Sequence, residues 1–156
     1  MNGQDSAALE FAIRRARAAL HVPADIPGRA WAVAPIRTET RDFVLVVLGT
    51  PAAATAVAAV DTASGEVLES AHLPGSEPHA VMPATEAIRR AGFGAHTQAR
   101  LVWAPTPASR SRFYPLWELS SGDDRAWVDS VRGVVCNTLD GTGVGGGSGG
   151  SLNPHP

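Results

Sequence analysis

Apolar residues recur near the start of the chain with the spacing of an amphipathic helix. Four of them are separated by three or four positions, so a helix would carry them on one face. Ser6 or Asp5 can cap its first turn, and the prolines of segment 21–28 stop it. The pattern therefore predicts a helix that ends near Leu20. Its apolar face consists of Leu9, Ile13, Ala16 and Leu20.

Short apolar runs follow this helix and predict four strands. They cover residues 30–36, 43–48, 56–61 and 66–71. The run 43–48 contains no polar residue, which indicates a strand buried on both faces rather than on one. We therefore expect another part of the chain, or a second subunit, to cover its other side.

The second half of the chain repeats this order of patterns. A helix is expected over residues 82–91, with Pro83 in its first turn and Gly92 as its stop. The composition of segment 72–78 predicts the connection between the halves. Pro115 cannot donate to a ladder, which places its strand at an edge or beside a bulge. The expected strands are 98–104, 113–120, 125–131 and a short piece at 134–135.

Two short motifs recur in the same order, which indicates an internal duplication. Val-Asp-Thr-Ala-Ser-Gly-Glu-Val at 60–67 has a looser counterpart, Val-Asp-Ser-Val-Arg-Gly-Val-Val, at 128–135. Ala-Ile-Arg-Arg-Ala stands at 12–16 and again at 87–91. In each Asp-x-x-x-Gly unit the Asp accepts from backbone amides of a hairpin turn and the Gly supplies a positive φ. These turn residues are Asp61, Gly65, Asp129 and Gly133.

The repetition predicts an α+β fold made of two tandem repeats, each a helix followed by an antiparallel meander (αβββ). The first repeat would span residues 1–73 and the second 74–136, with a flexible Gly-rich tail at 137–156. A helix followed by a meander that ends in Val-Asp-x-x-x-Gly-x-Val resembles the PepSY family, whose domains are similar to cystatin in architecture. The resemblance implies a protein that is not an enzyme and that binds or restrains a peptidase.

Composition excludes several classes of function. With 13 Lys plus Arg and a net charge of −2, the chain lacks the positive charge of a dedicated nucleic-acid binder. No apolar run is long enough to span a membrane, and the first residues do not have the pattern of a secretory signal. The single cysteine, Cys136, excludes an internal disulfide. We therefore expect a globular cytoplasmic protein.

The sequence offers no strong catalytic or metal motif. The five histidines fall in expected loops or in the tail, and no two of them have the spacing that places both on one helix face. Cys136 follows an apolar strand end, as structural thiols do, and Asp61 and Asp129 are accounted for by their turns. The Gly run at 141–147 precedes no helix that could bind a phosphate. The prediction is a protein without metal, cofactor or catalytic residues. The histidines are His21, His72, His79, His96 and His155.

Aromatic residues of the second half form the best candidate binding surface. Three tryptophans fall near the middles of successive expected strands, where they can line up across the sheet. They either pack under the helices or form a concave apolar surface for an extended peptide, an apolar ligand or a second copy of the chain. The candidate residues are Trp103, Phe113, Trp117 and Trp127.

The tail 137–156 is too rich in Gly to bury enough surface to offset its ordering entropy. Its Ser151-Leu152 element resembles the tails of encapsulin cargo, and Leu152 would be its apolar anchor. We expect a non-catalytic module that binds a protein or peptide, with a homodimer as one form of partner. Two alternatives remain: a precursor or cargo protein whose tail is the functional peptide, and a small enzyme with an aromatic-lined pocket.

Overall fold

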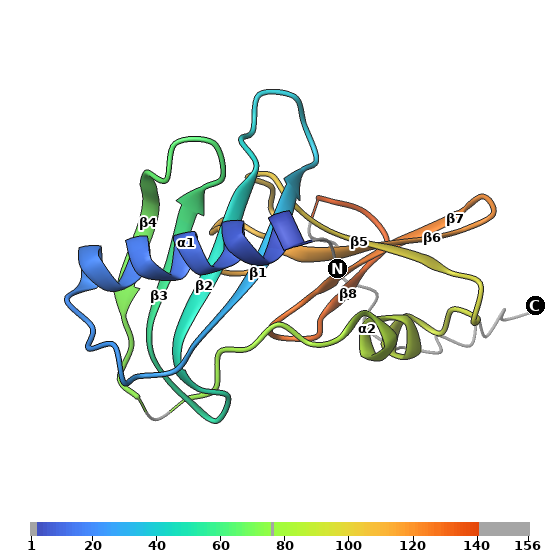
Figure 1. The fold of residues 1–156 in the computed structure, drawn as a ribbon. Coiled ribbons are helices and arrows are strands. Elements are labelled where there is room, and N and C mark those ends of the chain that lie inside the picture. The colour runs from blue at the N-terminus through green and yellow to red at the C-terminus, as the bar shows by residue number, and fades with distance from the viewer. Residues whose placement is uncertain (1–2, 76, 141–156) are drawn as a thin grey trace, which may run out of the picture.

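The computed structural model describes residues 3–75 and 77–140, which form an α+β fold around one mixed sheet (Figure 1). The strand order is β4-β3-β2-β1-β5-β6-β7-β8. All neighbouring strands are antiparallel except β1 and β5, which meet in the middle of the sheet and run parallel. The helices are α1 (Gly3–Leu20) and α2 (Ala84–Ala91). The strands are β1 (Gly28–Pro35), β2 (Phe43–Thr50), β3 (Ala53–Asp61), β4 (Val67–His72), β5 (Gln98–Trp103), β6 (Leu116–Ser121), β7 (Asp124–Asp129) and β8 (Val135–Cys136).

Helix α1 covers one face of the first four strands. Ala12, Ala16 and Leu20 are buried against the sheet, with Leu9 and Ile13 partly buried beside them. Two of the facing side chains of β3 are alanines, Ala56 and Ala58, and small residues on both sides allow the helix to lie close to the sheet. The predicted apolar face of this helix is therefore the face that packs.

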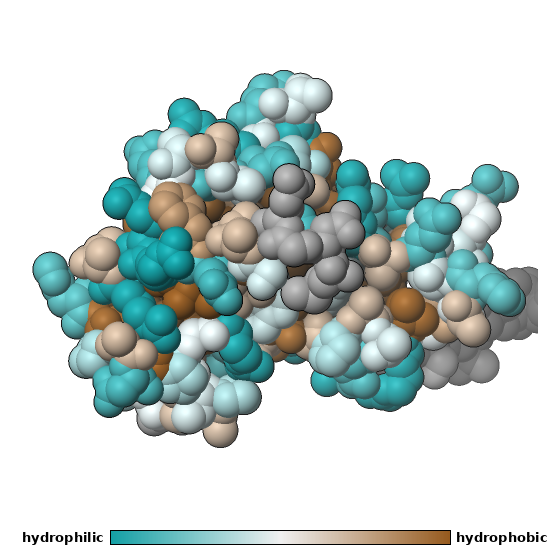
Figure 2. Space-filling model, viewed as in Figure 1, coloured by the Kyte–Doolittle hydropathy of each residue, from teal (hydrophilic) through white to brown (hydrophobic). Residues whose placement is uncertain are grey.

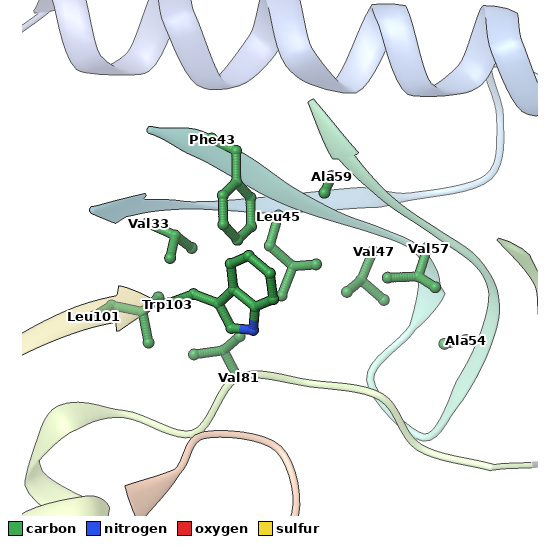
Figure 3. Close-up of a cluster of buried hydrophobic side chains, with 10 residues drawn as sticks. All are labelled: Val33, Phe43, Leu45, Val47, Ala54, Val57, Ala59, Val81, Leu101 and Trp103. Carbon is green, nitrogen blue, oxygen red and sulfur yellow. The ribbon is translucent and has the colours of Figure 1, made fainter. Parts of the chain in front are cut away.

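Strand β2 is buried on both faces, as its unbroken apolar run indicated. Val44 and Val46 lie under α1, whereas Phe43, Leu45 and Val47 belong to a second cluster on the opposite face. Figure 3 shows Trp103 in the middle of that cluster, with Val81 on its far side and α1 beyond the sheet. Residues of the second half of the chain thus cover the other side of β2. The whole buried set of this cluster is Val33, Phe43, Leu45, Val47, Ala54, Val57, Ala59, Val81, Leu101 and Trp103.

Helix α2 packs on the face of the sheet opposite to α1. Its Ala87 is buried with Leu119 and Val128, and this face of β6 continues through Trp117 into the cluster around Trp103. Pro83 occupies the position before its first residue, and Gly92 ends it in the left-handed conformation with φ 73°. The two helices therefore lie on opposite sides of one sheet.

The observed strands correct three expectations. Strand β6 begins at Leu116 rather than at 113, because Pro115 and the turn before it lie outside the ladder. The placement of this strand at an edge or beside a bulge is wrong, since β6 pairs with β5 and β7 on either side in a regular register. His72 lies at the end of β4 rather than in a loop. Within the described residues, no helix is both long enough and apolar enough to cross a bilayer.

Candidate functional site

The sheet is split in its middle, where β1 and β5 diverge. These strands pair only through Ala34 with Val102 and Pro35 with Trp103. The pairing is continued by the Ile36 N–H, which donates to the Trp103 carbonyl at 3.1 Å. Toward their first residues the strands separate, as Figure 1 shows. A strand in the middle of an eight-stranded sheet therefore has an open edge over most of its length.

Along the open edge of β1, alternate backbone groups have no partner among the described residues. The Gly49 N–H donates to the Pro27 carbonyl at 2.8 Å, and antiparallel pairing alternates along a strand. The odd-numbered residues of β1 therefore bond to β2, and Gly28, Ala30 and Ala32 direct N–H and C=O away from it. None of the described strands pairs with this stretch, and Ala32 is exposed. Such an edge is a template for another strand.

A hollow of about 660 Å³ lies along this edge, between α1 and the segment that leads into α2. Its volume is within the range of ligand sites, roughly 300–1,000 Å³. Outside the atoms drawn in grey, hydrophilic residues on the α1 side are interspersed with smaller hydrophobic areas (Figure 2). The larger apolar side chains that line the hollow are Leu9, Ile13, Trp31, Val81, Met82 and Trp117, and its charged ones are Glu10 and Arg29.

Arg29 is the unusual charged residue of this lining. Its guanidinium lies over the Trp31 ring, 5.3 Å from the ring centroid. The Nε and Nη2 atoms are shielded from solvent, and neither has a hydrogen-bond partner among the described residues. None of the described carboxylates forms an ion pair with this side chain. A shielded N–H without an acceptor costs about 1–3 kcal/mol, and more when it is charged.

The predicted aromatic residues do not form one surface. Trp103 is 2% exposed and packs edge-on against Phe43, with ring centroids 6.1 Å apart. Trp117 lies on the same face as Trp103 and lines the hollow, where its Nε1–H donates to the Met82 carbonyl at 2.9 Å. Phe113 precedes β6 and packs at the edge of the same cluster. Of the four, only Trp117 lines the hollow.

Trp127 lies on the other face of the second half of the sheet. It pairs with Glu118, whereas Trp117 pairs with Val128, so the two indoles point to opposite sides. The Trp127 Nε1–H donates to Glu118 Oε2 at 3.2 Å, and Arg100 bonds the other carboxylate oxygen at 3.3 Å. The expectation that three tryptophans line up across the sheet is therefore wrong for Trp127. Its surroundings are polar rather than apolar.

The two Asp-x-x-x-Gly turns are built alike. Asp61 Oδ1 accepts from the backbone N–H groups of Ala63 and Ser64 at 2.9 and 2.8 Å, and the Gly65 N–H donates to the Asp61 carbonyl at 2.9 Å. The Ser64 backbone N–H is the main reason that the pKa of Asp61 is lowered, and Arg41 lowers it further. Gly65 has φ 73°, a conformation that glycine adopts without strain.

The second turn, Asp129–Gly133, repeats this geometry near the end of the described chain. Asp129 Oδ1 accepts from the N–H groups of Val131 and Arg132 at 2.9 and 2.7 Å, and the Gly133 N–H donates to the Asp129 carbonyl at 2.8 Å. Gly133 has φ 78°. Both carboxylates are thus engaged by their own turns, which lie at opposite ends of the strand order.

The other residues considered for catalysis or metal binding, His79 and Cys136, are buried in the fold. His79 is 5% exposed, and its Nε2–H donates to the Phe113 carbonyl at 2.8 Å, while burial lowers the pKa of the ring. Cys136 is buried in β8, and burial raises the pKa of its thiol. Among the described residues, no three His, Cys, Asp or Glu side chains are grouped to hold a metal ion. The proposed tail anchors, Ser151 and Leu152, lie outside the described residues.

Arg29 and Trp31 were not among the residues predicted from sequence. A signal was present: the stretch Arg29-Ala30-Trp31-Ala32 alternates large and small residues, unlike the continuous apolar run of β2. That contrast indicates a strand less completely covered than β2, and most of β1 is indeed only partly buried. The neighbour of β1 could not be predicted, because its pairing with β5 joins distant parts of the chain.

Searches of family models, curated proteins and solved structures found no match to this chain. The site is therefore interpreted from its own geometry.

Proposed function

We propose that this chain is a non-catalytic module that binds an extended segment of a protein or peptide in the split between β1 and β5. The observation that supports this most directly is the free backbone edge at Gly28, Ala30 and Ala32, which lies beside an apolar hollow. An added strand gains main-chain hydrogen bonds from the edge, and side-chain pockets give it specificity.

The walls of the hollow suit both faces of such a strand. Successive side chains of a strand point to opposite faces of the sheet. On one side they would meet Leu9 and Ile13 of α1, and on the other Trp31 and Trp117. The aromatic rings offer large contact areas, and the Trp117 ring is already fixed by its bond to the Met82 carbonyl.

We also propose that the chain consists of two tandem αβββ repeats related to PepSY domains, with the split at their junction. The matched turns support this, because each begins at an Asp that ends an inner strand and reaches a Gly that lies against a helix. Arg15 of α1 donates to the Gly65 carbonyl at 2.9 Å, and Arg90 of α2 lies against Gly133. These arginines hold equivalent positions in the repeated Ala-Ile-Arg-Arg-Ala motif. In this proposal the partner is a peptidase or another protein that offers an extended strand.

A displayed library of random eight-residue peptides, selected on the immobilised full chain, tests the binding function. Peptides should be enriched, and their binding should slow amide hydrogen exchange at Ala30 and Ala32 while leaving the β7 amides unchanged. Trp117→Ala should weaken the selected peptides, and Trp127→Ala serves as the matched control on the other face.

A proline substitution tests the backbone contact itself. Ala32→Pro removes one N–H that points into the split from an exposed position, where the ladder to β2 does not use it. It should abolish binding and leave the thermal midpoint nearly unchanged, whereas Ala32→Val keeps the N–H and should bind. If no peptide is enriched, or if the selected peptides protect another part of the chain, the proposed function is wrong.

A further inference from the structure

We propose that Arg29 selects an acidic side chain of the bound segment, so that the module takes peptides with Asp or Glu opposite this arginine. This inference rests on the proposed function, because it concerns a ligand strand in the same split. Among the described residues, Arg29 has no ion pair, and its Nε and Nη2 atoms have no acceptor.

The two nitrogens are the ones that bind a carboxylate together. Nε–H and the adjacent Nη2–H lie on one side of the planar guanidinium and donate in parallel to the two oxygens of a carboxylate. Arg29 also lines the hollow, and both nitrogens are shielded from solvent, so a ligand carboxylate would reach them only when the guanidinium turns toward the hollow. A carboxylate satisfies both donors at once, whereas a neutral carbonyl oxygen offers a weaker and less matched acceptor.

The strand geometry fixes where the carboxylate must stand. Arg29 and Trp31 are two residues apart, so they lie on the same face of β1. A strand paired with the open edge places its own alternate side chains beside them, where opposite charges and apolar pairs are favourable. The ligand should therefore have an acidic residue at one position and an apolar residue two positions away. The residue between them faces Leu9 and Ile13 and should be apolar as well.

Glu10 is the other charged residue of the lining. It belongs to α1, on the face of the sheet opposite to the Arg29 and Trp31 side chains, and it is exposed. A carboxylate held against Arg29 is therefore separated from Glu10 by the ligand backbone. The Trp31 ring beneath the guanidinium limits its hydration, which strengthens its attraction for an anion.

The test uses the peptides selected from the displayed library, made as synthetic peptides with acetylated and amidated ends. Most of them should contain an acidic residue two positions from an apolar one, in either chain direction. For the tightest peptide, replacing this Glu by Gln, or Asp by Asn, should weaken binding to the wild-type chain about tenfold or more, as expected for the loss of a charge-assisted pair. Isothermal titration calorimetry measures each dissociation constant.

Two variants of the chain, measured with the same pair of peptides, complete a double-mutant cycle. Arg29→Gln should bind the Glu and Gln peptides equally, and Arg125→Gln, an exposed strand arginine in β7, should retain the full preference. Lower ionic strength should increase the preference of the wild type and of Arg125→Gln, but not that of Arg29→Gln. Peptides that bind the split without an acidic preference, or an unchanged preference in Arg29→Gln, would overturn the role of Arg29 and leave the peptide-binding function standing. Failure of every peptide to bind would overturn both.

Discussion

Replacing Val46 or Val47 by Asp tests whether β2 is covered on both faces. Val46 faces α1, Val47 faces the cluster around Trp103, and both are 0% exposed. Losing a fully buried valine costs about 1.5–3 kcal/mol of hydrophobic free energy. An unpaired buried carboxylate adds several kcal/mol more. The sum is comparable with the whole stability of a typical domain, about 5–15 kcal/mol, so both variants should be largely unfolded.

Milder substitutions give measurable free energies. Val46→Ala and Val47→Ala each remove two methyl groups and leave a cavity, so each should lower the free energy of unfolding by about 2–3 kcal/mol. Val134 is 52% exposed and provides the matched control. Val134→Asp and Val134→Ala should each change the free energy of unfolding by about 0.5 kcal/mol or less. Urea unfolding followed by tryptophan fluorescence measures these values.

The two Asp variants test the two faces of β2 separately. A stable Val47→Asp variant beside an unfolded Val46→Asp variant would show that the second half of the chain does not cover β2. Stability of both variants would refute the two-sided burial altogether. An equal, moderate loss in all three valine positions would contradict the distinction between buried and exposed sites on which the estimate depends.

Three further outcomes follow from the turns, the buried histidine and the tail. Asp61→Ala and Asp129→Ala should each cost about 1–3 kcal/mol in urea unfolding, because two backbone N–H groups lose a charged acceptor. Since the pKa of Asp61 is lowered from 3.8, its contribution is present above pH 3.8 and is lost as the pH falls through the folded-state value, a dependence that Asp61→Asn should reduce. The pKa of His79 is lowered from 6.5, so acidification below pH 6.5 should reduce stability until the folded-state pKa is passed, and His79→Gln should remove this dependence. Stopping the chain after Leu139, whose carbonyl accepts from the Ala108 N–H, should leave the thermal midpoint nearly unchanged in calorimetry; a large drop would mean that the removed residues pack against the fold.

Local chemistry made much of the fold predictable. The Asp-x-x-x-Gly spacing fixed both hairpin turns, since it places an acceptor and a positive φ at set positions. The unbroken run 43–48 indicated burial on both faces because an exposed face would require alternating polar residues. These inferences need only residues that are near one another in the sequence.

The pairing register of β6 and β7 decides on which face of the sheet Trp127 lies. Strands β6 and β7 are joined by a two-residue turn, so Ser121 pairs with Asp124 and every paired couple contains one odd and one even number. Trp117 and Trp127 are both odd and cannot share a face. The strand ends expected from sequence, 120 and 125, give this same register, so the positions of the two tryptophans already placed them on opposite faces.

The meeting of β1 with β5 could not be predicted, because nothing local selects the strand that pairs across the middle of a sheet. The pairing of β1 with β5 depends on a few residues at the ends of the two strands. Trp103 packs against Phe43, and its carbonyl accepts from the Ile36 N–H. Beyond that contact the strands are free to diverge, and no buried apolar side chain of β5 lies opposite Arg29 to close the gap.

Because β1 and β5 pair at one end of the split and diverge at the other, substitutions at the two ends should have different effects. Trp103 is 2% exposed at the closed end, so substitutions there should act on folding. Arg29, at the open end, is shielded by one aromatic ring and is bonded by no described acceptor, so its replacement removes an uncompensated charge. In the proposed function, Arg29→Gln should therefore leave the fold as stable as before, or more stable, while it abolishes the acidic preference. A residue retained for packing would show the reverse, with a loss of stability and no change in the preference between the Glu and Gln peptides.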